Sequence, residues 1–180
     1  MIYSLRRLSS PKLSFLGLLL VGLISSIVIL RADNPPESPL TIGALAPNFV
    51  LRGLDGEEVT LENLRGKLIF LNFWATWCKP CEDEMPAMER LYDEFKDEEF
   101  QMLAVAVGDE PEDVRNFQKR LGLTFPILLD QLGKVSTLYQ SFRFPETYWI
   151  DPNGRIVSRF IGPREWDDIS YKTRLSGIIP

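Results

Sequence analysis

Hydrophobic positions divide the chain into one long uncharged run near the N-terminus and a body of shorter apolar segments. Residues 13–30 read LSFLGLLLVGLISSIVIL, eighteen residues without a charge, which meets the lower limit for spanning a bilayer. Arg6, Arg7 and Lys12 precede this run, so the positive-inside rule places the N-terminus in the cytoplasm. We therefore predict a single-pass anchor over residues 1–31 that holds the chain in the cytoplasmic membrane.

A cleaved signal peptide is the alternative interpretation of this run, and the sequence leaves it open. The run is longer than the usual core of a signal peptide, and Leu30 stands where a cleavage site requires a small residue. Residues 32–40 (ADNPPESPL) have the proline-rich polar composition of a linker. We predict that residues 41–180 form the folded domain, on the extracytoplasmic (periplasmic) side of the membrane.

Strand-like and helix-like patterns alternate along this body. Nearly continuous apolar runs at 68–73 and 100–107 predict strands that are buried on both faces. Apolar residues at three- and four-residue spacing predict helices at 81–95 and 111–121. Shorter predicted elements are strands at 48–51, 58–61, 125–129, 147–150 and 156–161 and helices at 134–139 and 166–175. This alternation predicts an α/β domain with a mixed central sheet flanked by helices, because the turn at 151–154 closes the chain with an antiparallel hairpin.

Composition excludes several classes of function. The chain contains no histidine, which rules out a Cys/His protease, a Ser-His-Asp hydrolase and any zinc site that uses histidine. Its two cysteines are too few for a four-thiolate zinc site. The body after Asp33 is acidic, which argues against binding of nucleic acid.

Both cysteines lie in one segment, NFWATWCKPCEDEMP, where a buried strand leads into a helix. A thiol at the start of a helix meets free backbone N–H groups and the positive end of the helix dipole, which favour the reactive thiolate. Cys78 is therefore the predicted nucleophile, and Cys81, one turn into the helix, is predicted to be more buried and to resolve the mixed disulfide. Lys79 either adds a positive charge that favours the thiolate or is an ordinary solvated lysine.

Three uses of the pair are possible: a structural disulfide, a metal site or a redox site. A disulfide across three positions closes too small a loop to stabilise a fold, and a metal site lacks further thiolate or histidine ligands. The order of strand, Cys-x-x-Cys and helix favours a redox site. That site requires no metal and no other cofactor.

The cysteine segment closely resembles the active-site segment of thioredoxin-fold proteins. Within these it resembles the membrane-anchored extracytoplasmic thiol-disulfide oxidoreductases of the TlpA/ResA type, which include the cytochrome c maturation reductases. The resemblance extends over about residues 41–165, through GALAPNF, LRGKLIFLNFWATWCKPC, FPILLD and FPETYWIDPNGRIV. It implies a thioredoxin-like fold in which Cys78 and Cys81 are the redox pair and Pro145 is a cis-proline that helps to hold the partner chain.

The resemblance also implies which residues contact the substrate and where the chain departs from its relatives. We expect Trp77, Phe144, Pro145 and Glu146 to contact the substrate. Relatives often have glycines before the cis-proline, whereas residues 140–144 of this chain read QSFRF. Bulk and charge beside the active site are expected to alter which partner is recognised.

A second departure concerns the group that handles the thiol proton. Ordinary thioredoxins carry a buried aspartate two residues before the first tryptophan of the motif, and Asn72 stands at that position here. An amide cannot take the proton, so we expect the duty to pass to Glu84, at the offset where ResA-like proteins carry a functional glutamate. A carboxyl group can act as an acid or base near neutral pH if burial raises its pKa. The alternative is a solvated acidic residue like Glu82 and Asp83.

The favoured function is a membrane-tethered reductase of selected protein disulfides, with apocytochrome c as a plausible substrate by resemblance only. In an oxidising compartment such a pair needs an electron donor, which we expect to be a thiol-disulfide protein of the membrane. Copper binding or delivery through the paired thiols is the first alternative. A thiol peroxidase is less favoured, because Leu71 and Ala75 replace the proline and threonine that its Pro-x-x-x-Thr-x-x-Cys pattern requires.

Overall fold

The computed structural model describes residues 40–180, so the predicted anchor and nearly all of the predicted linker lie outside the described residues. Within residues 40–180, no helix combines the length and the apolar character that are needed to cross a bilayer. The anchor over residues 1–31 and the division of the chain at residue 41 therefore stay predictions.

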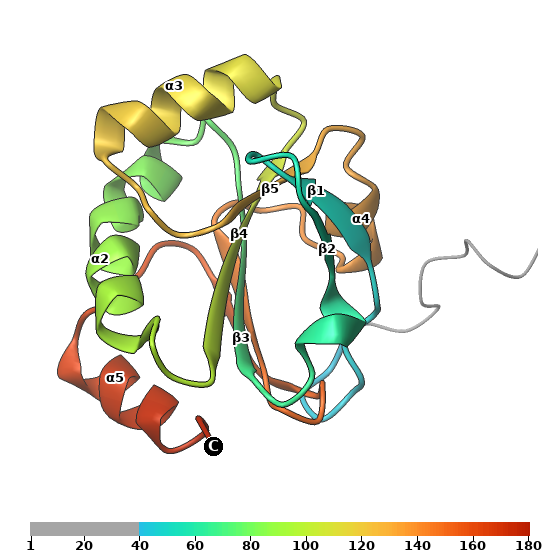
Figure 1. The fold of residues 1–180 in the computed structure, drawn as a ribbon, viewed down its shortest axis with the longest axis vertical. Coiled ribbons are helices and arrows are strands. Elements are labelled where there is room, and N and C mark those ends of the chain that lie inside the picture. The colour runs from blue at the N-terminus through green and yellow to red at the C-terminus, as the bar shows by residue number, and fades with distance from the viewer. Residues whose placement is uncertain (1–39) are drawn as a thin grey trace, which may run out of the picture. The chain divides into compact units, whose positions relative to one another are not determined.

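A seven-stranded sheet in the order β2-β1-β5-β4-β3-β6-β7 forms the centre of the fold (Figure 1). The strands are β1 (Val50–Gly53), β2 (Glu58–Thr60), β3 (Leu68–Trp74), β4 (Phe100–Val107), β5 (Ile127–Asp130), β6 (Glu146–Ile150) and β7 (Ile156–Ile161). Strands β3, β4 and β5 are parallel, whereas the remaining pairs are antiparallel. The predicted mixed sheet is confirmed, and the β1–β2 hairpin adds a second antiparallel edge.

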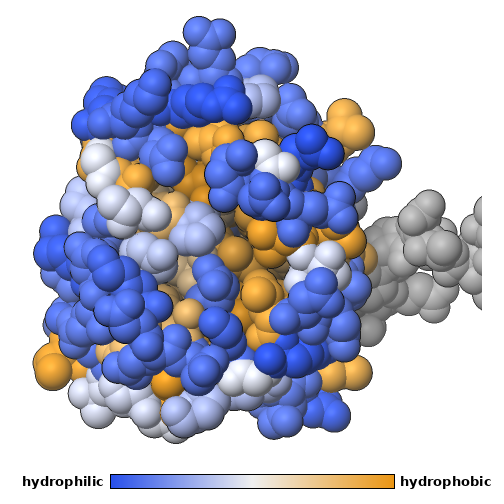
Figure 2. All heavy atoms as spheres, viewed as in Figure 1, coloured by the Kyte–Doolittle hydropathy of each residue, from blue (hydrophilic) through white to orange (hydrophobic). Residues whose placement is uncertain are grey.

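Helices cover both faces of this sheet. They are α2 (Lys79–Phe95), α3 (Pro111–Leu121), α4 (Lys134–Leu138) and α5 (Ile169–Ser176), with the 3-10 helix η1 at Leu61–Leu64. Buried side chains of α2, α3 and α5 belong to one hydrophobic cluster, and those of α4 and η1 belong to the cluster on the opposite face. Figure 2 shows hydrophobic side chains in the middle of the face that is viewed in Figure 1, between hydrophilic margins.

Burial on both faces explains why the sequence of β3 is an almost unbroken apolar run. All seven of its side chains are buried. Phe70 and Trp74 belong to the cluster beneath α2, whereas Leu71 and Phe73 belong to the opposite cluster. Alternate side chains of a strand face opposite sides, so a strand that is covered on both sides needs apolar residues at nearly every position. Asn72 is the polar exception, and its side chain reaches the α2 side.

Two predicted elements began too early, because a buried aromatic side chain in the preceding segment was counted as part of the strand or helix. Strand β5 begins at Ile127 rather than at Phe125, which is buried in the segment before the strand. Helix α5 begins at Ile169 rather than at Trp166, because the Asp168 side chain caps it by accepting from the Ser170 N–H. Hydrophobic side chains of connecting segments carry no periodicity that separates them from a neighbouring strand or helix.

The predicted ranges of β4, α3 and β7 are confirmed at both ends, and the other boundaries differ by at most two residues. Helix α2 begins at Lys79 rather than at residue 81, β1 covers Val50–Gly53 rather than 48–51, and β6 begins at Glu146 rather than at residue 147. Pro80 is compatible with the earlier start of α2, because the first turn of a helix has free N–H groups.

Candidate active site

The two cysteines form a disulfide where β3 leads into α2. Cys78 is the N-cap residue of α2, and its sulfur accepts a hydrogen bond from the Cys81 backbone N–H at 3.3 Å. Cys78 is 5% exposed and Cys81 is fully buried. The prediction that Cys81 is the more buried sulfur is confirmed, and only the Cys78 sulfur is within reach of a partner molecule.

A carboxylate in the segment just after β4 holds the turn before the cysteines. Asp109 follows β4, and its two oxygens accept from the Thr76 backbone N–H at 2.8 Å and from the Thr76 hydroxyl at 2.7 Å. This contact was not predicted from the sequence. The available signal was an acidic residue directly after a buried parallel strand, since the carboxyl ends of neighbouring parallel strands meet at one edge of the sheet.

Lys79 is paired with acidic side chains of its own helix. Its ammonium group lies 2.6 Å from Asp83 Oδ1 and 3.6 Å from Glu82 Oε1, and the hydrogen bond that it donates to Asp83 raises the pKa of Lys79. Glu82 also accepts two hydrogen bonds of 3.0 Å from Arg120 on α3. The Lys79 charge is therefore directed at carboxylates, which favours the interpretation of an ordinary surface lysine.

Glu84 is a buried carboxyl group one helical turn after Cys81, on the same buried face of α2. It is 3% exposed, whereas Asp83 beside it is exposed. Its Oε2 accepts from the Trp166 indole N–H at 3.0 Å and from the Arg164 backbone N–H at 3.1 Å. Burial raises the pKa of Glu84 to about 7, although these hydrogen bonds favour the charged form and oppose the rise. The interpretation of Glu84 as a solvated acidic residue is therefore wrong.

Asn72 connects Glu84 to the sheet. Its side-chain amide donates to Glu84 Oε1 at 3.0 Å and to the Thr147 hydroxyl at 2.9 Å. The residue that replaces the thioredoxin aspartate therefore contacts the carboxyl group that was predicted to take over its duty. Asn72 fixes the position of Glu84 between β3, β6 and α2.

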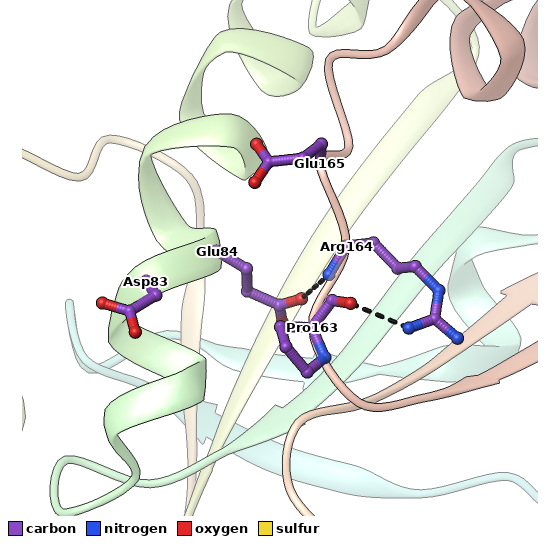
Figure 3. Close-up of a pocket in the computed structure, with 5 residues that line it drawn as sticks. All are labelled: Asp83, Glu84, Pro163, Arg164 and Glu165. Carbon is purple, nitrogen blue, oxygen red and sulfur yellow. Dashed lines mark hydrogen bonds between the residues drawn. The ribbon is translucent and has the colours of Figure 1, made fainter.

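An open pocket of about 200 Å³ lies over Glu84. Figure 3 shows Asp83 and Glu84 on α2 and Pro163, Arg164 and Glu165 on the segment between β7 and α5. The Glu84 carboxyl group points across to the Arg164 backbone, while the Arg164 guanidinium turns away and donates to the Pro163 carbonyl oxygen at 2.8 Å. Solvent can therefore approach the carboxyl group from the side of this segment.

Three of the predicted substrate contacts lie together beside the disulfide. Trp77 precedes Cys78 and is 73% exposed, and its ring centroid lies 6.1 Å from that of Phe144. The Phe144–Pro145 peptide bond is cis, as the resemblance implied. The roles of these residues in substrate binding stay predictions.

Glu146, the fourth predicted contact, is directed elsewhere. It is the first residue of β6, and its buried side chain contacts Ser141, Tyr148 and Arg159. Tyr148 belongs to the cluster on the face opposite α2, so Glu146 and Glu84 lie on opposite faces of the sheet. Contact between Glu146 and a substrate stays a prediction.

Metal ligands do not gather around the pair in the part of the chain that the structure describes. No group of three or more cysteine, aspartate, glutamate or histidine side chains among residues 40–180 is placed to hold a metal ion. The chemistry that the arrangement supports is thiol-disulfide exchange at Cys78 with a buried carboxyl group nearby.

A Cys-x-x-Cys disulfide between a parallel strand and the start of a helix is the arrangement of thioredoxin-like thiol-disulfide oxidoreductases. Comparison with known proteins places the chain within this class. Residues 42–159 match the AhpC/TSA family, and the chain belongs to this family and, within it, to the ResA-like thiol-disulfide oxidoreductases.

The similarity to individual proteins extends over most of the domain. The chain is 42% identical over 144 residues to thiol-disulfide oxidoreductase ResA of Geobacillus thermodenitrificans, which covers 80% of this chain and 82% of that protein. ResA of Bacillus subtilis is 39% identical over 147 residues, or 81% of this chain and 82% of the relative. The thioredoxin domain of a thiol-disulfide oxidoreductase from Bacteroides vulgatus has a TM-score of 0.68 at 26% identity and covers 77% of this chain and 99% of its own. The predicted fold and the predicted class of enzyme are confirmed.

Proposed function

We propose that this oxidoreductase works as a reductase of selected protein disulfides outside the cytoplasm. The observation that carries the direction of electron flow is the burial of the pair beside a carboxyl group rather than beside a cation. Strong oxidants with this type of site stabilise the thiolate of their reduced form. In this chain the Lys79 charge is directed at Asp83, and Glu84 lies on the same buried face as Cys81. The Cys78 thiolate is then stabilised by the start of α2 alone, without a directed cation, and this supports a lower reduction potential than that of a strong oxidant and hence a reductant.

The reaction transfers two electrons from the dithiol to the substrate. The Cys78 thiolate attacks one substrate sulfur, the substrate disulfide breaks, and a mixed disulfide forms as the first substrate thiolate leaves. The Cys81 thiol then gives its proton to the Glu84 carboxylate and attacks the Cys78 sulfur. The enzyme disulfide forms again, and the second substrate sulfur leaves as a thiolate. A dithiol donor must then reduce the Cys78–Cys81 disulfide for another cycle.

We also propose where the domain lies and which partners it has. The predicted anchor over residues 1–31 holds the domain at the outer side of the cytoplasmic membrane, where a membrane thiol-disulfide protein supplies the electrons. Trp77, which precedes Cys78, and Phe144, which packs against Trp77, contact the substrate chain together with Pro145. The resemblance to cytochrome c maturation reductases supports apocytochrome c, which carries a Cys-x-x-Cys-His haem attachment site, as a substrate.

We expect the reduced full chain to reduce an oxidised Cys-x-x-Cys-His peptide faster than a peptide with the same disulfide loop but unrelated flanking residues. The measurement is the second-order rate constant for each peptide, from the appearance of free thiols. Equal rate constants would contradict apocytochrome c as a preferred substrate. Stoichiometric, tight binding of Cu(I) without reduction of either peptide would contradict the reductase and favour the copper alternative.

A further inference from the structure

An ion pair between the buried Glu146 and the partly exposed Arg159 lies behind the loop that carries Pro145. Glu146, at the start of β6, accepts from Arg159 Nε of β7 at 2.6 Å. The other Glu146 oxygen accepts from the Ser141 hydroxyl at 2.9 Å. The second arm of the Arg159 guanidinium donates to the Gln140 carbonyl oxygen at 3.3 Å. We call these four residues the loop latch.

The loop latch joins the two ends of one short loop. Gln140 and Ser141 begin the loop and Glu146 ends it, so the hydrogen bonds close residues 140–146 against β7. Gln140 has a φ of 53°, in the left-handed region that favours glycine. The Arg159 contact to the Gln140 carbonyl oxygen holds this backbone conformation without a glycine.

The segment that the loop latch holds lies beside the disulfide. Phe142 is 70% exposed, and Phe144 packs against Trp77, the residue before Cys78. The Pro145 carbonyl oxygen accepts from the Gly162 N–H at 2.8 Å, which ties the same loop to the end of β7. A shift of the loop would therefore move the exposed aromatic surface that a substrate chain meets at the Cys78 sulfur.

We propose that Glu146 and Arg159 are positioning residues that set the affinity for protein substrates by fixing loop 140–145. The inference rests on the proposed reductase function and deepens it. A carboxylate that is buried beside one guanidinium is strongly destabilised when that partner is removed, so the pair permits few loop conformations. Neither charge needs to touch the substrate, because the pair acts through the loop that carries Phe142, Phe144 and Pro145.

The test compares a protein disulfide with a small one. Arg159→Gln in the full chain removes the charge and both arms of the guanidinium, whereas Arg159→Lys keeps the charge but loses the forked geometry. With insulin as the protein substrate, we expect Arg159→Gln to raise KM about tenfold with little change in kcat, since a hydrogen bond to a charged group is lost. The rate with hydroxyethyl disulfide, which is too small to span the loop, and the reduction potential of the pair are expected to stay as in wild type. Arg159→Lys is expected to recover part of the affinity.

A control variant distinguishes an effect on loop position from a general loss of stability, and the wild-type activity tests the reductase function separately. Glu94→Gln removes an ion pair of the same length, 2.6 Å to Lys172, far along α2 from the cysteines, and is expected to leave both substrates unaffected. A wild-type KM for insulin in Arg159→Gln, or an equal loss with both disulfides, would overturn the positioning role. If Arg159→Gln does not fold, a wild-type KM in Arg159→Lys overturns it. Failure of the wild-type chain to reduce both insulin and the oxidised Cys-x-x-Cys-His peptide would instead overturn the reductase function.

Discussion

Cys78→Ala is expected to reduce disulfide-exchange activity to the uncatalysed rate, whereas Cys81→Ala is expected to accumulate a mixed disulfide with the substrate. Cys78 is the partly accessible sulfur at the start of α2, and Cys81 is fully buried beneath it. Attack on a substrate therefore requires Cys78, and release of the substrate requires Cys81. The measurement is free-thiol production with each variant, together with the mass of the covalent complex under non-reducing conditions.

The two cysteine variants are matched controls for each other, because each loses the disulfide and retains one thiol. A difference between them therefore reflects which sulfur reacts first. Trapping of substrate on Cys81 in the Cys78→Ala variant, with no complex in the Cys81→Ala variant, would reverse the assignment of nucleophile and resolving thiol.

Glu84→Gln is expected to slow the resolution of the mixed disulfide by roughly 10²-fold and to remove its pH dependence near neutrality. The pKa of Glu84 is about 7, so the carboxylate that accepts the Cys81 proton becomes available as pH rises through this value. The wild-type rate should therefore rise between about pH 6 and 8. Stopped-flow measurement of the resolution step across this range tests the prediction.

Glutamine can fit the hydrogen-bonding surroundings of Glu84 without its charge. The glutamine oxygen can keep the hydrogen bonds from the Arg164 backbone N–H and the Trp166 indole N–H. Asn72 Oδ1 is buried and lacks a partner among the described residues. If the Asn72 amide turns over, this oxygen can accept a hydrogen bond from the glutamine amide. Asp83→Asn changes the adjacent exposed carboxylate and is the matched control. An unchanged pH profile in Glu84→Gln, or an equal change in Asp83→Asn, would contradict proton transfer through Glu84.

The same carboxyl group predicts how stability depends on pH. Its pKa is about 7 in the folded chain against an ordinary 4.5, so the folded state holds a proton that the unfolded state releases between these values. Stability therefore falls as pH rises from about 4.5 to 7, by roughly 3 kcal/mol in total, and this loss is absent from Glu84→Gln. Urea unfolding of the oxidised proteins at the two ends of this range compares the two slopes.

Local patterns were sufficient for the centre of the fold and for the redox pair. The apolar runs of β3 and β4 and the apolar spacing of α2 depend on neighbouring residues alone, so they were visible in the sequence. The predicted starts of β5 and α5 were wrong because Phe125 and Trp166 are buried in connecting segments. Such burial depends on which elements pack against the segment, and the local sequence does not show this. Cys78, Cys81 and Glu84 follow one another at three-residue spacing, about one helical turn per step, so their spacing indicated a common site.

Contacts between distant residues could not be predicted in the same way. The position of Glu84 depends on Trp166 and Arg164, about eighty residues later in the chain. The ion pair of Glu146 with Arg159 depends on the pairing of β6 with β7, and the local sequence pattern does not give that register. Such pairs are set by strand register and layer packing, which hydrophobic periodicity does not specify.

The equilibrium reduction potential of the Cys78–Cys81 pair tests the central claim most directly. It is obtained by equilibrating the full chain with a series of thiol-disulfide redox buffers and counting the free thiols. A buried pair without a directed cation predicts a value of about −250 mV or lower, in the range of thioredoxin-like reductants. A value near −120 mV, which marks a strong oxidant, would contradict the claim that this chain reduces the disulfides of its partners.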